Sequence, residues 1–231
     1  RDEIERRKVF EKDYIVDYFP SQRPEVEQSI LASLMERKYG RQIDRGKNYR
    51  QIMIDSMEGS LKRLGTDHVD LMMCPHGAST PEEVTQYPEI FDAFEKLKKD
   101  GKVRYLGVSA HNDPGGVLAA AASSGKYDAA MVAYSIINHS YVDAGLSKAH
   151  AAGMGVIAMK VARPVFNGRN NGTIDPPERV AKVQAAVPGP LKVPQKAYVW
   201  ALRNAKLSAV ISEMGNAAIT KDNLALAGAK A

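Results

Sequence analysis

Cysteine is nearly absent from the sequence, because Cys74 is the single one among 231 residues. One cysteine excludes a disulfide within the chain and a metal cluster built from cysteines, and we expect no metal. Scarce cysteine also suits a reducing compartment, so we expect a cytoplasmic protein. Long apolar runs are absent as well. No segment reaches the roughly 18 residues of a membrane span, and we expect no membrane partner.

Charge of one sign is not concentrated in any part of the chain. The formal net charge is +5 and the isoelectric point about 9.1, but acids are interspersed with bases, as in the stretch FEKLKKDGKVR. No zinc-ligand spacing or aromatic nucleic-acid motif accompanies this mild basicity, so we expect no nucleic-acid partner. A hydrophobic share of 44% with 26% charged residues is that of an ordinary globular chain.

Two kinds of segment alternate along the chain from about residue 48 onward. Segments with apolar residues at helical spacing are followed by short apolar runs of strand length. Helices are expected at 49–65, 88–101, 113–125, 142–153, 194–205 and 220–228, and strands at 68–74, 102–109, 128–135, 155–160 and 207–212. Apolar strands joined by helices indicate parallel pairing with both faces of the sheet covered.

A parallel sheet of this kind is either a doubly wound open sheet or a (β/α)8 barrel. An open dinucleotide-binding sheet carries the spacing GxGxxG at its first strand-to-helix turn, and the chain has none there. We therefore predict an α/β fold of the TIM-barrel type, with its first strands missing or poorly represented. Two parts are expected: 1–48, a divergent or incomplete N-terminal segment, and 49–231, the barrel units.

Polar side chains follow each of the expected strands. Active sites of barrels form at the carboxyl ends of the strands, so these residues are candidates for a site wall. Lys160 ends an apolar strand, where an unpaired ammonium would be costly, and we expect it to meet an anion or a carboxylate. Core packing with a satisfied hydroxyl stays open for Tyr134. The strand-end candidates are His76, Ser109, His111, Asn112, Tyr134, Lys160 and Asn216.

Four stretches carry a resemblance to a known family. In chain order they read SLKRLGTDHVDLMMCPHG, FEKLKKDGKVRYLGVSAHN, GVIAMK and YVWALRNAKLSAVISEMGNAAITKDNLALAG. Over about residues 50–228 the chain resembles the aldo-keto reductases, in particular the bacterial branch related to iron–sulfur-containing members. No cysteine follows the last expected helix, so no cluster is assigned to this chain.

The resemblance implies a TIM barrel that binds NADP or NAD and transfers a hydride to a small carbonyl substrate, an aldehyde or a ketone. It makes His76 the catalytic histidine that orients the carbonyl. In the alignment to the motif, Pro75 stands where the family has this histidine, and His76 is one position further on. Ser109 matches the serine that contacts the nicotinamide carboxamide. Ala110 replaces the asparagine that follows in the family, and His111 and Asn112 are the candidate substitutes.

The last of the four stretches contains the residues that the resemblance assigns to the adenine end of the cofactor. Asn223 matches the asparagine of the final helix that meets the adenine, and the family's phosphate-binding loop reads SEMGN here. Glu213 in this loop would repel a 2′-phosphate, so NADP and NAD both stay open. We take Tyr134, Lys160 and Asn216 as further cofactor-binding candidates. The oligomeric state cannot be read from the sequence.

The family's catalytic aspartate, tyrosine and lysine are not identifiable in residues 1–48. One alternative is therefore a non-catalytic barrel relative that acts as a binding or scaffold protein. Another is a barrel lyase or isomerase that uses Lys160 and His76. The Gly- and Pro-rich insertion at 163–194 follows the fourth expected strand. We expect a loop that gates the substrate, and a long surface connection is the alternative.

Overall fold

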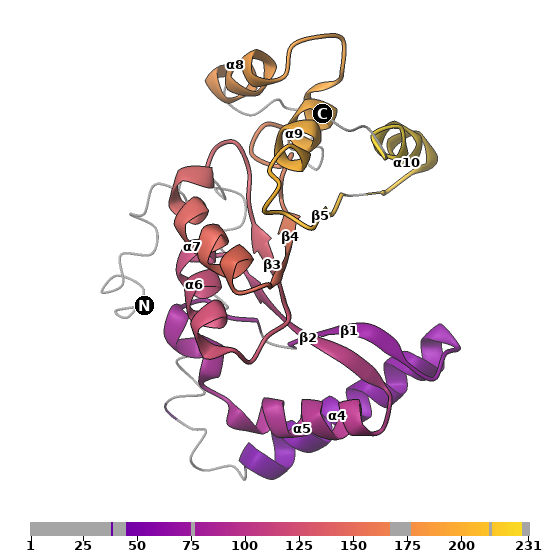
Figure 1. Cartoon of the computed structure of the whole chain (residues 1–231). Coiled ribbons are helices and arrows are strands. Elements are labelled where there is room, and N and C mark those ends of the chain that lie inside the picture. Colours follow the sequence, from indigo (N-terminus) through magenta and orange to yellow (C-terminus); the bar gives the residue numbers. More distant parts are fainter. Residues whose placement is uncertain (1–37, 39–44, 75–76, 167–176, 213, 228–231) are drawn as a thin grey trace.

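The computed structural model describes residues 38, 45–74, 77–166, 177–212 and 214–227, in which five strands alternate with helices (Figure 1). The strands are β1 (Val69–Met73), β2 (Val103–Ala110), β3 (Ala129–Ala133), β4 (Gly155–Met159) and β5 (Ala209–Val210). The helices are α4 (Arg45–Leu64), η4 (Pro81–Thr85, a 3-10 helix), α5 (Pro88–Lys99), α6 (Pro114–Ser124), α7 (His139–Ala151), α8 (Pro177–Ala186), α9 (Val193–Leu202) and α10 (Ala217–Leu224).

The strands form one parallel sheet whose spatial order follows the sequence, β1-β2-β3-β4-β5. A doubly wound sheet would reverse its strand order at a switch point, whereas a barrel adds each strand beside the previous one. Helices α5, α6, α7 and α9 pack against the outer side of the curved sheet (Figure 1). The described units therefore form part of a (β/α)8 barrel, as the sequence predicts.

The two faces of the sheet differ in exposure. In β2, Leu106 and Val108 are 0% and 1% exposed, whereas Tyr105 is 52% exposed. Because side chains alternate along a strand, Leu106 and Val108 face the helices and Tyr105 faces the inner side of the curved sheet. Leu71 of β1 lies opposite Tyr105 in the register and is half-buried. The main core therefore lies between the strands and the outer helices.

Helix α6 begins and ends as its sequence predicts. Asp113 is the N-cap, and its Oδ1 accepts the backbone N–H of Gly116 at 3.0 Å. Pro114 occupies the first turn, where a missing N–H costs nothing. Gly125 ends the helix at φ 62°, in the left-handed region that favours glycine.

Helices α6 and α7 touch backbone to backbone at two glycines. A Cβ on Gly145 would lie 2.1 Å from the carbonyl oxygen of Gly115, and one on Gly115 would lie 2.3 Å from that of Tyr141. Both distances are far inside van der Waals contact, so neither position has room for a side chain. This packing fixes the spacing of the two helices outside β2, β3 and β4.

The C-terminal third departs from expectation. The insertion at 163–194 was expected as a loop, but its described part contains helix α8, whose Val180 and Val183 are buried. Strand β5 comprises two residues where 207–212 was expected.

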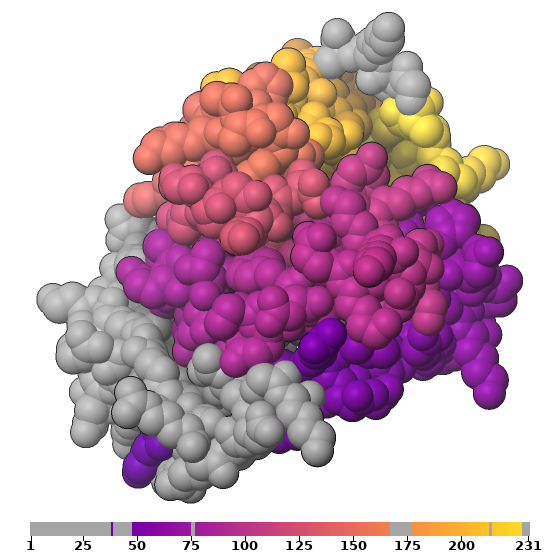
Figure 2. All heavy atoms as spheres, turned by 60° about the horizontal axis from the view of Figure 1, so that its bottom comes forward, coloured from indigo at the N-terminus to yellow at the C-terminus, as the bar shows by residue number. Residues whose placement is uncertain are grey.

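The expected boundary at residue 49 falls inside α4, and residues 1–37 and 39–44 lie outside the described ranges. In the space-filling view, successive units cover neighbouring parts of the surface in chain order (Figure 2).

Candidate functional site

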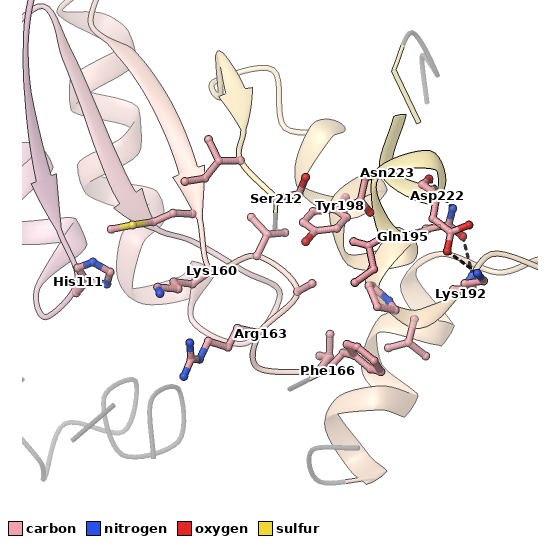
Figure 3. A pocket seen from close by; sticks show the side chains of 18 residues that line it. His111, Lys160, Arg163, Phe166, Lys192, Gln195, Tyr198, Ser212, Asp222 and Asn223 are labelled. Atoms are coloured by element: carbon pink, nitrogen blue, oxygen red, sulfur yellow. Dashed lines mark hydrogen bonds and ion pairs between the residues drawn. The ribbon is translucent and has the colours of Figure 1, made fainter. Parts of the chain in front are cut away.

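A cavity of about 880 Å³ opens at the carboxyl ends of β4 and β5. Its wall combines the loop after β2, the turn after β4, the start of α9, the residues after β5 and one side of α10 (Figure 3). The carboxyl ends of parallel strands are where barrel sites form, so the cavity lies where the sequence places a site. Its lining is His111, Met159–Arg163, Val165, Phe166, Lys192–Gln195, Tyr198, Ile211, Ser212, Ile219, Asp222 and Asn223.

Basic side chains gather at one end of this cavity. His111 and Lys160 lie on the same side of the opening, with Arg163 near them (Figure 3). Lys160 has φ 60°, and among the described residues it is the non-glycine residue in the left-handed region. Such a conformation costs of order 1–3 kcal/mol and persists where the surrounding structure imposes it. The N–H of Arg163 donates to the carbonyl oxygen of Lys160 at 3.2 Å, which closes the turn after β4.

A polar network builds the other end, between α9 and α10. Gln195 is 9% exposed, and its Oε1 accepts the backbone N–H of Lys192, the N-cap residue of α9, at 3.1 Å. Its Nε2 donates to the carbonyl oxygen of Asp222 at 2.8 Å. The ammonium of Lys192 pairs with the carboxylate of the same aspartate. Two contacts from α9 thus converge on one residue of α10, beside Asn223 (Figure 3).

The structure brings three of the candidate residues together. His111, Lys160 and Asn223 line the cavity. Asn112, the neighbour of His111, is 6% exposed, and among the described residues its Nδ2 has no hydrogen-bond partner. A buried amide N–H of this kind is costly unless a partner satisfies it. The loop after β2 therefore presents an imidazole and an unsatisfied donor next to each other.

Ser109 and Asn216 lie outside the cavity lining. Ser109 is half-buried in β2, and its carbonyl oxygen accepts the N–H of Ala78 at 2.8 Å. Asn216 caps α10, because its Oδ1 accepts the N–H of Ile219 at 2.9 Å. His76 lies outside the described residues, as does Glu213. The cofactor roles of Ser109 and Asn216 and the catalytic role of His76 stay predictions.

Tyr134 follows β3 but faces α7 and α9. Its hydroxyl donates to Oδ1 of Asp143 at 3.0 Å and accepts from Nδ2 of Asn204 at 2.8 Å. The residue is 2% exposed and lies outside the cavity lining. Burial, with the charge of Asp143 adding to it, raises the pKa of the hydroxyl above its usual value. The alternative left open from sequence, a packed tyrosine with its hydroxyl satisfied, matches this environment.

Several residues of the cavity wall were not anticipated. Phe166, Lys192, Gln195, Tyr198 and Asp222 line it, and none was a candidate. Gln195 carries no capping signal in the sequence, because the residue three positions before it is Lys192 and not a serine or threonine. Tyr198 follows it on the same face of the helix at i+3. Only the pairing of α9 with α10 makes both of them wall residues.

None of the helices in the described ranges combines the length and apolarity needed to cross a membrane. Within the same ranges, no group of three or more His, Cys, Asp or Glu side chains is arranged to hold a metal ion.

Comparisons with known proteins match most of the chain to one family. Residues 21–229 match the family model described as the aldo/keto reductase family. Among curated proteins, an uncharacterized oxidoreductase, YrpG of Bacillus subtilis, is 45% identical over 53 residues, which are 23% of this chain and 15% of YrpG. The oxidoreductase YdhF of Escherichia coli is 42% identical over 60 residues, 26% of this chain and 19% of YdhF.

A solved structure shares the fold. An aldose reductase from Giardia lamblia superposes with a TM-score of 0.56 at 13% identity, and the match covers 82% of this chain and 66% of that one. At this identity the similarity establishes the fold alone, and the (β/α)8 architecture predicted from the sequence is confirmed. The chain spans less than two thirds of the relatives that it matches.

Proposed function

The chain belongs to the aldo/keto reductase family, and from this premise we propose that it is an NAD(P)H-dependent oxidoreductase that reduces an aldehyde or a ketone. The observation that carries the proposal is the cavity at the strand ends, which has His111, Lys160 and Arg163 at one end and amide groups with the Lys192–Asp222 ion pair at the other. Barrel enzymes place their chemistry at this rim.

The lining fits a dinucleotide in charge and in chemistry. Lys160 and Arg163 supply cations suited to phosphate oxygens, and the fork of Arg163 can hold one oxygen pair. Asn223 offers an amide that suits the edge of an adenine, and Asp222 offers a carboxylate that suits a ribose hydroxyl. Phe166 adds an aromatic surface between these polar ends (Figure 3).

The loop after β2 supplies groups for the nicotinamide. Asn112 is buried and lies outside the cavity lining, so we assign it to holding this loop in place and not to contact with the nicotinamide carboxamide. We assign Ser109 and His111 to the same carboxamide on the family resemblance. Asn216 and Tyr134 have their side chains engaged within the protein, which argues for a supporting role for both.

When bound, the reduced nicotinamide supplies a hydride to the carbonyl carbon, and the carbonyl oxygen must take up a proton as the alcohol forms. The residues of this chain bind and orient the reactants: cations at the rim hold phosphates, and His76 orients the carbonyl in our proposal. Desolvating the cavity strengthens each of these interactions.

The test has a binding arm and a transfer arm. Titration with NADPH and with NADH, read by energy transfer from Trp200 to the nicotinamide, should give saturable binding of at least one. A deuterium-labelled cofactor should then deliver deuterium to the carbonyl carbon of an aldehyde. Binding without transfer would favour the non-catalytic relative instead. Absence of binding by either dinucleotide would end the proposal. Trapping a Schiff base on Lys160 with borohydride would support the lyase alternative.

A further inference from the structure

One buried tyrosine joins α7 to the end of α9, the helix whose first turns line the cavity. Tyr134 donates its hydroxyl hydrogen to Asp143 of α7 at 3.0 Å and accepts from Asn204, just after α9, at 2.8 Å. The other carboxylate oxygen of Asp143 lies 2.9 Å from Nδ1 of His139. The hydroxyl therefore donates one hydrogen bond to α7 and accepts another from the residue that follows α9.

Aromatic packing adds to this connection. The ring of Trp200 on α9 stacks on Tyr134, with centroids 5.5 Å apart and planes inclined by 20°. The same indole lies 5.4 Å from the ring of His139 on α7. Stacked aromatic pairs contribute roughly 0.5–1.5 kcal/mol beyond their buried area. The stacking gives contact area, while the hydroxyl bonds fix the direction in which α9 is held.

Helix α9 links the contacts of Tyr134 to the cavity wall. Tyr198 lies on the helix two residues before Trp200 and lines the cavity, and Gln195 at its start binds the backbone of Asp222 on α10 at 2.8 Å. A shift of α9 against α7 would therefore move the wall made by Tyr198 and, through Gln195, the wall made by α10. Packed interiors transmit such shifts because they contain few voids.

We propose that Tyr134 is a positioning residue, whose hydroxyl holds α9 against α7 and thereby sets the width of the cofactor cavity. This role differs from the cofactor contact expected from sequence. The identity of the ligand rests on the function proposed above, but the mechanical link does not. The hydroxyl is the deciding group, because the ring alone would leave the amide of Asn204 and a carboxylate oxygen of Asp143 without this partner.

The matched comparison is Tyr134→Phe against Tyr127→Phe. Tyr127 is also a buried tyrosine, 6% exposed, but its hydroxyl donates to the carbonyl oxygen of Val84 at 2.8 Å, on the side of the sheet covered by α5 and η4. Both variants lose one buried hydroxyl, so both should melt at a lower temperature. Only Tyr134→Phe should raise the Kd of NADPH or NADH, by about tenfold.

The fluorescence of Trp200 measures how firmly α9 is held, and it needs no ligand. Because the chain has one tryptophan, the signal comes from this residue alone. Tyr134→Phe should increase quenching of its fluorescence by acrylamide and speed amide hydrogen exchange across residues 193–202, whereas Tyr127→Phe should leave both as in the parent. Asn204→Ala, which removes the donor and keeps the tyrosine, should act in the same direction and replaces Tyr134→Phe if that variant does not fold.

Two results would overturn the inference. One is dinucleotide binding by Tyr134→Phe within about twofold of the parent, with unchanged exchange in α9. The other is an equal loss of affinity in Tyr127→Phe, which would make the effect one of general stability. If the parent binds neither dinucleotide, the proposed function fails, and the exchange of α9 alone decides whether Tyr134 positions it.

Discussion

Gln195 and Asp222 join two walls of the cavity. The side-chain amide of Gln195 on α9 donates to the backbone carbonyl of Asp222 on α10 at 2.8 Å. Helix α10 has no buried residue of its own, so its place depends on contacts of this kind. The ion pair of Lys192 with Asp222 adds little by itself, because the lysine side chain is 67% exposed. The buried amide is therefore the stronger tie.

Replacing Gln195 with alanine removes both of its hydrogen bonds. The free energy of unfolding should fall by about 1–2 kcal/mol, and dinucleotide affinity should fall as α10 moves away. Urea denaturation and fluorescence titration measure the two effects. Gln184→Ala is the control, because Gln184 is exposed on α8 and lies outside the cavity lining. Equal behaviour of the two variants would contradict the role given to Gln195.

Lys160 combines a strained backbone with a charge in the cavity. Both Lys160→Ala and Lys160→Gly remove the ammonium, so both should weaken dinucleotide binding. Glycine accepts φ 60° without strain, so Lys160→Gly should be more stable than Lys160→Ala by about 1 kcal/mol. Thermal unfolding compares the stabilities, and titration compares the affinities. An alanine variant that binds as tightly as the parent would remove Lys160 from the phosphate site.

Two Gly→Ala changes, one at the contact between α6 and α7 and one in α4, should have opposite effects on the free energy of unfolding. A Cβ at Gly145 meets a backbone oxygen at 2.1 Å, so Gly145→Ala should destabilise the fold by about 3 kcal/mol. In α4, the nearest atom to a Cβ at Gly59 is Nη1 of Arg63 at 3.2 Å, the end of a flexible side chain. Gly59→Ala should therefore stabilise by about 0.5–1 kcal/mol. Chemical denaturation of both variants checks the signs.

Alkaline pH should destabilise the fold through its buried tyrosines. Burial raises the pKa of Tyr127 and of Tyr134 above the usual value of 10.0. Their stabilising contribution is full below that value and is lost as pH rises, because the unfolded chain ionises first. Each tyrosine should cost about 1.4 kcal/mol between about pH 8 and about pH 11.

Denaturation at the two pH values measures this loss. The variants Tyr127→Phe and Tyr134→Phe should each lose less stability over that range than the parent, since one ionising group is gone from the unfolded chain. A variant that loses as much as the parent would show that its tyrosine does not contribute to the alkaline transition.

The alternating units could be predicted because each carries a local signal. Asp113, Pro114 and Gly125 mark the ends of α6, and the apolar strands between helices predict the parallel sheet and its order. Helix α8 was missed because prolines and glycines stand on both sides of its ten residues, which made the whole insertion read as a loop. Strand β5 pairs over two residues only, which no periodicity could predict.

The site was predicted in part, for a physical reason. His111, Lys160 and Asn223 follow strands or lie in a recognisable motif, and these line the cavity. Tyr134 follows a strand too, but the sequence could not show that Asp143 and Asn204 would engage its hydroxyl. Gln195 and Asp222 become wall residues only through the contact of α9 with α10, 27 positions apart in the chain.

A crystal structure of the chain with a nicotinamide dinucleotide bound tests the central claim most directly. The proposal places the ligand across the cavity, with its nicotinamide at the loop after β2 near His111, its phosphates at Lys160 and Arg163, and its adenine end at Asn223. A dinucleotide found at any other face of the sheet, or one that leaves Lys160 and Asn223 untouched, would contradict the account.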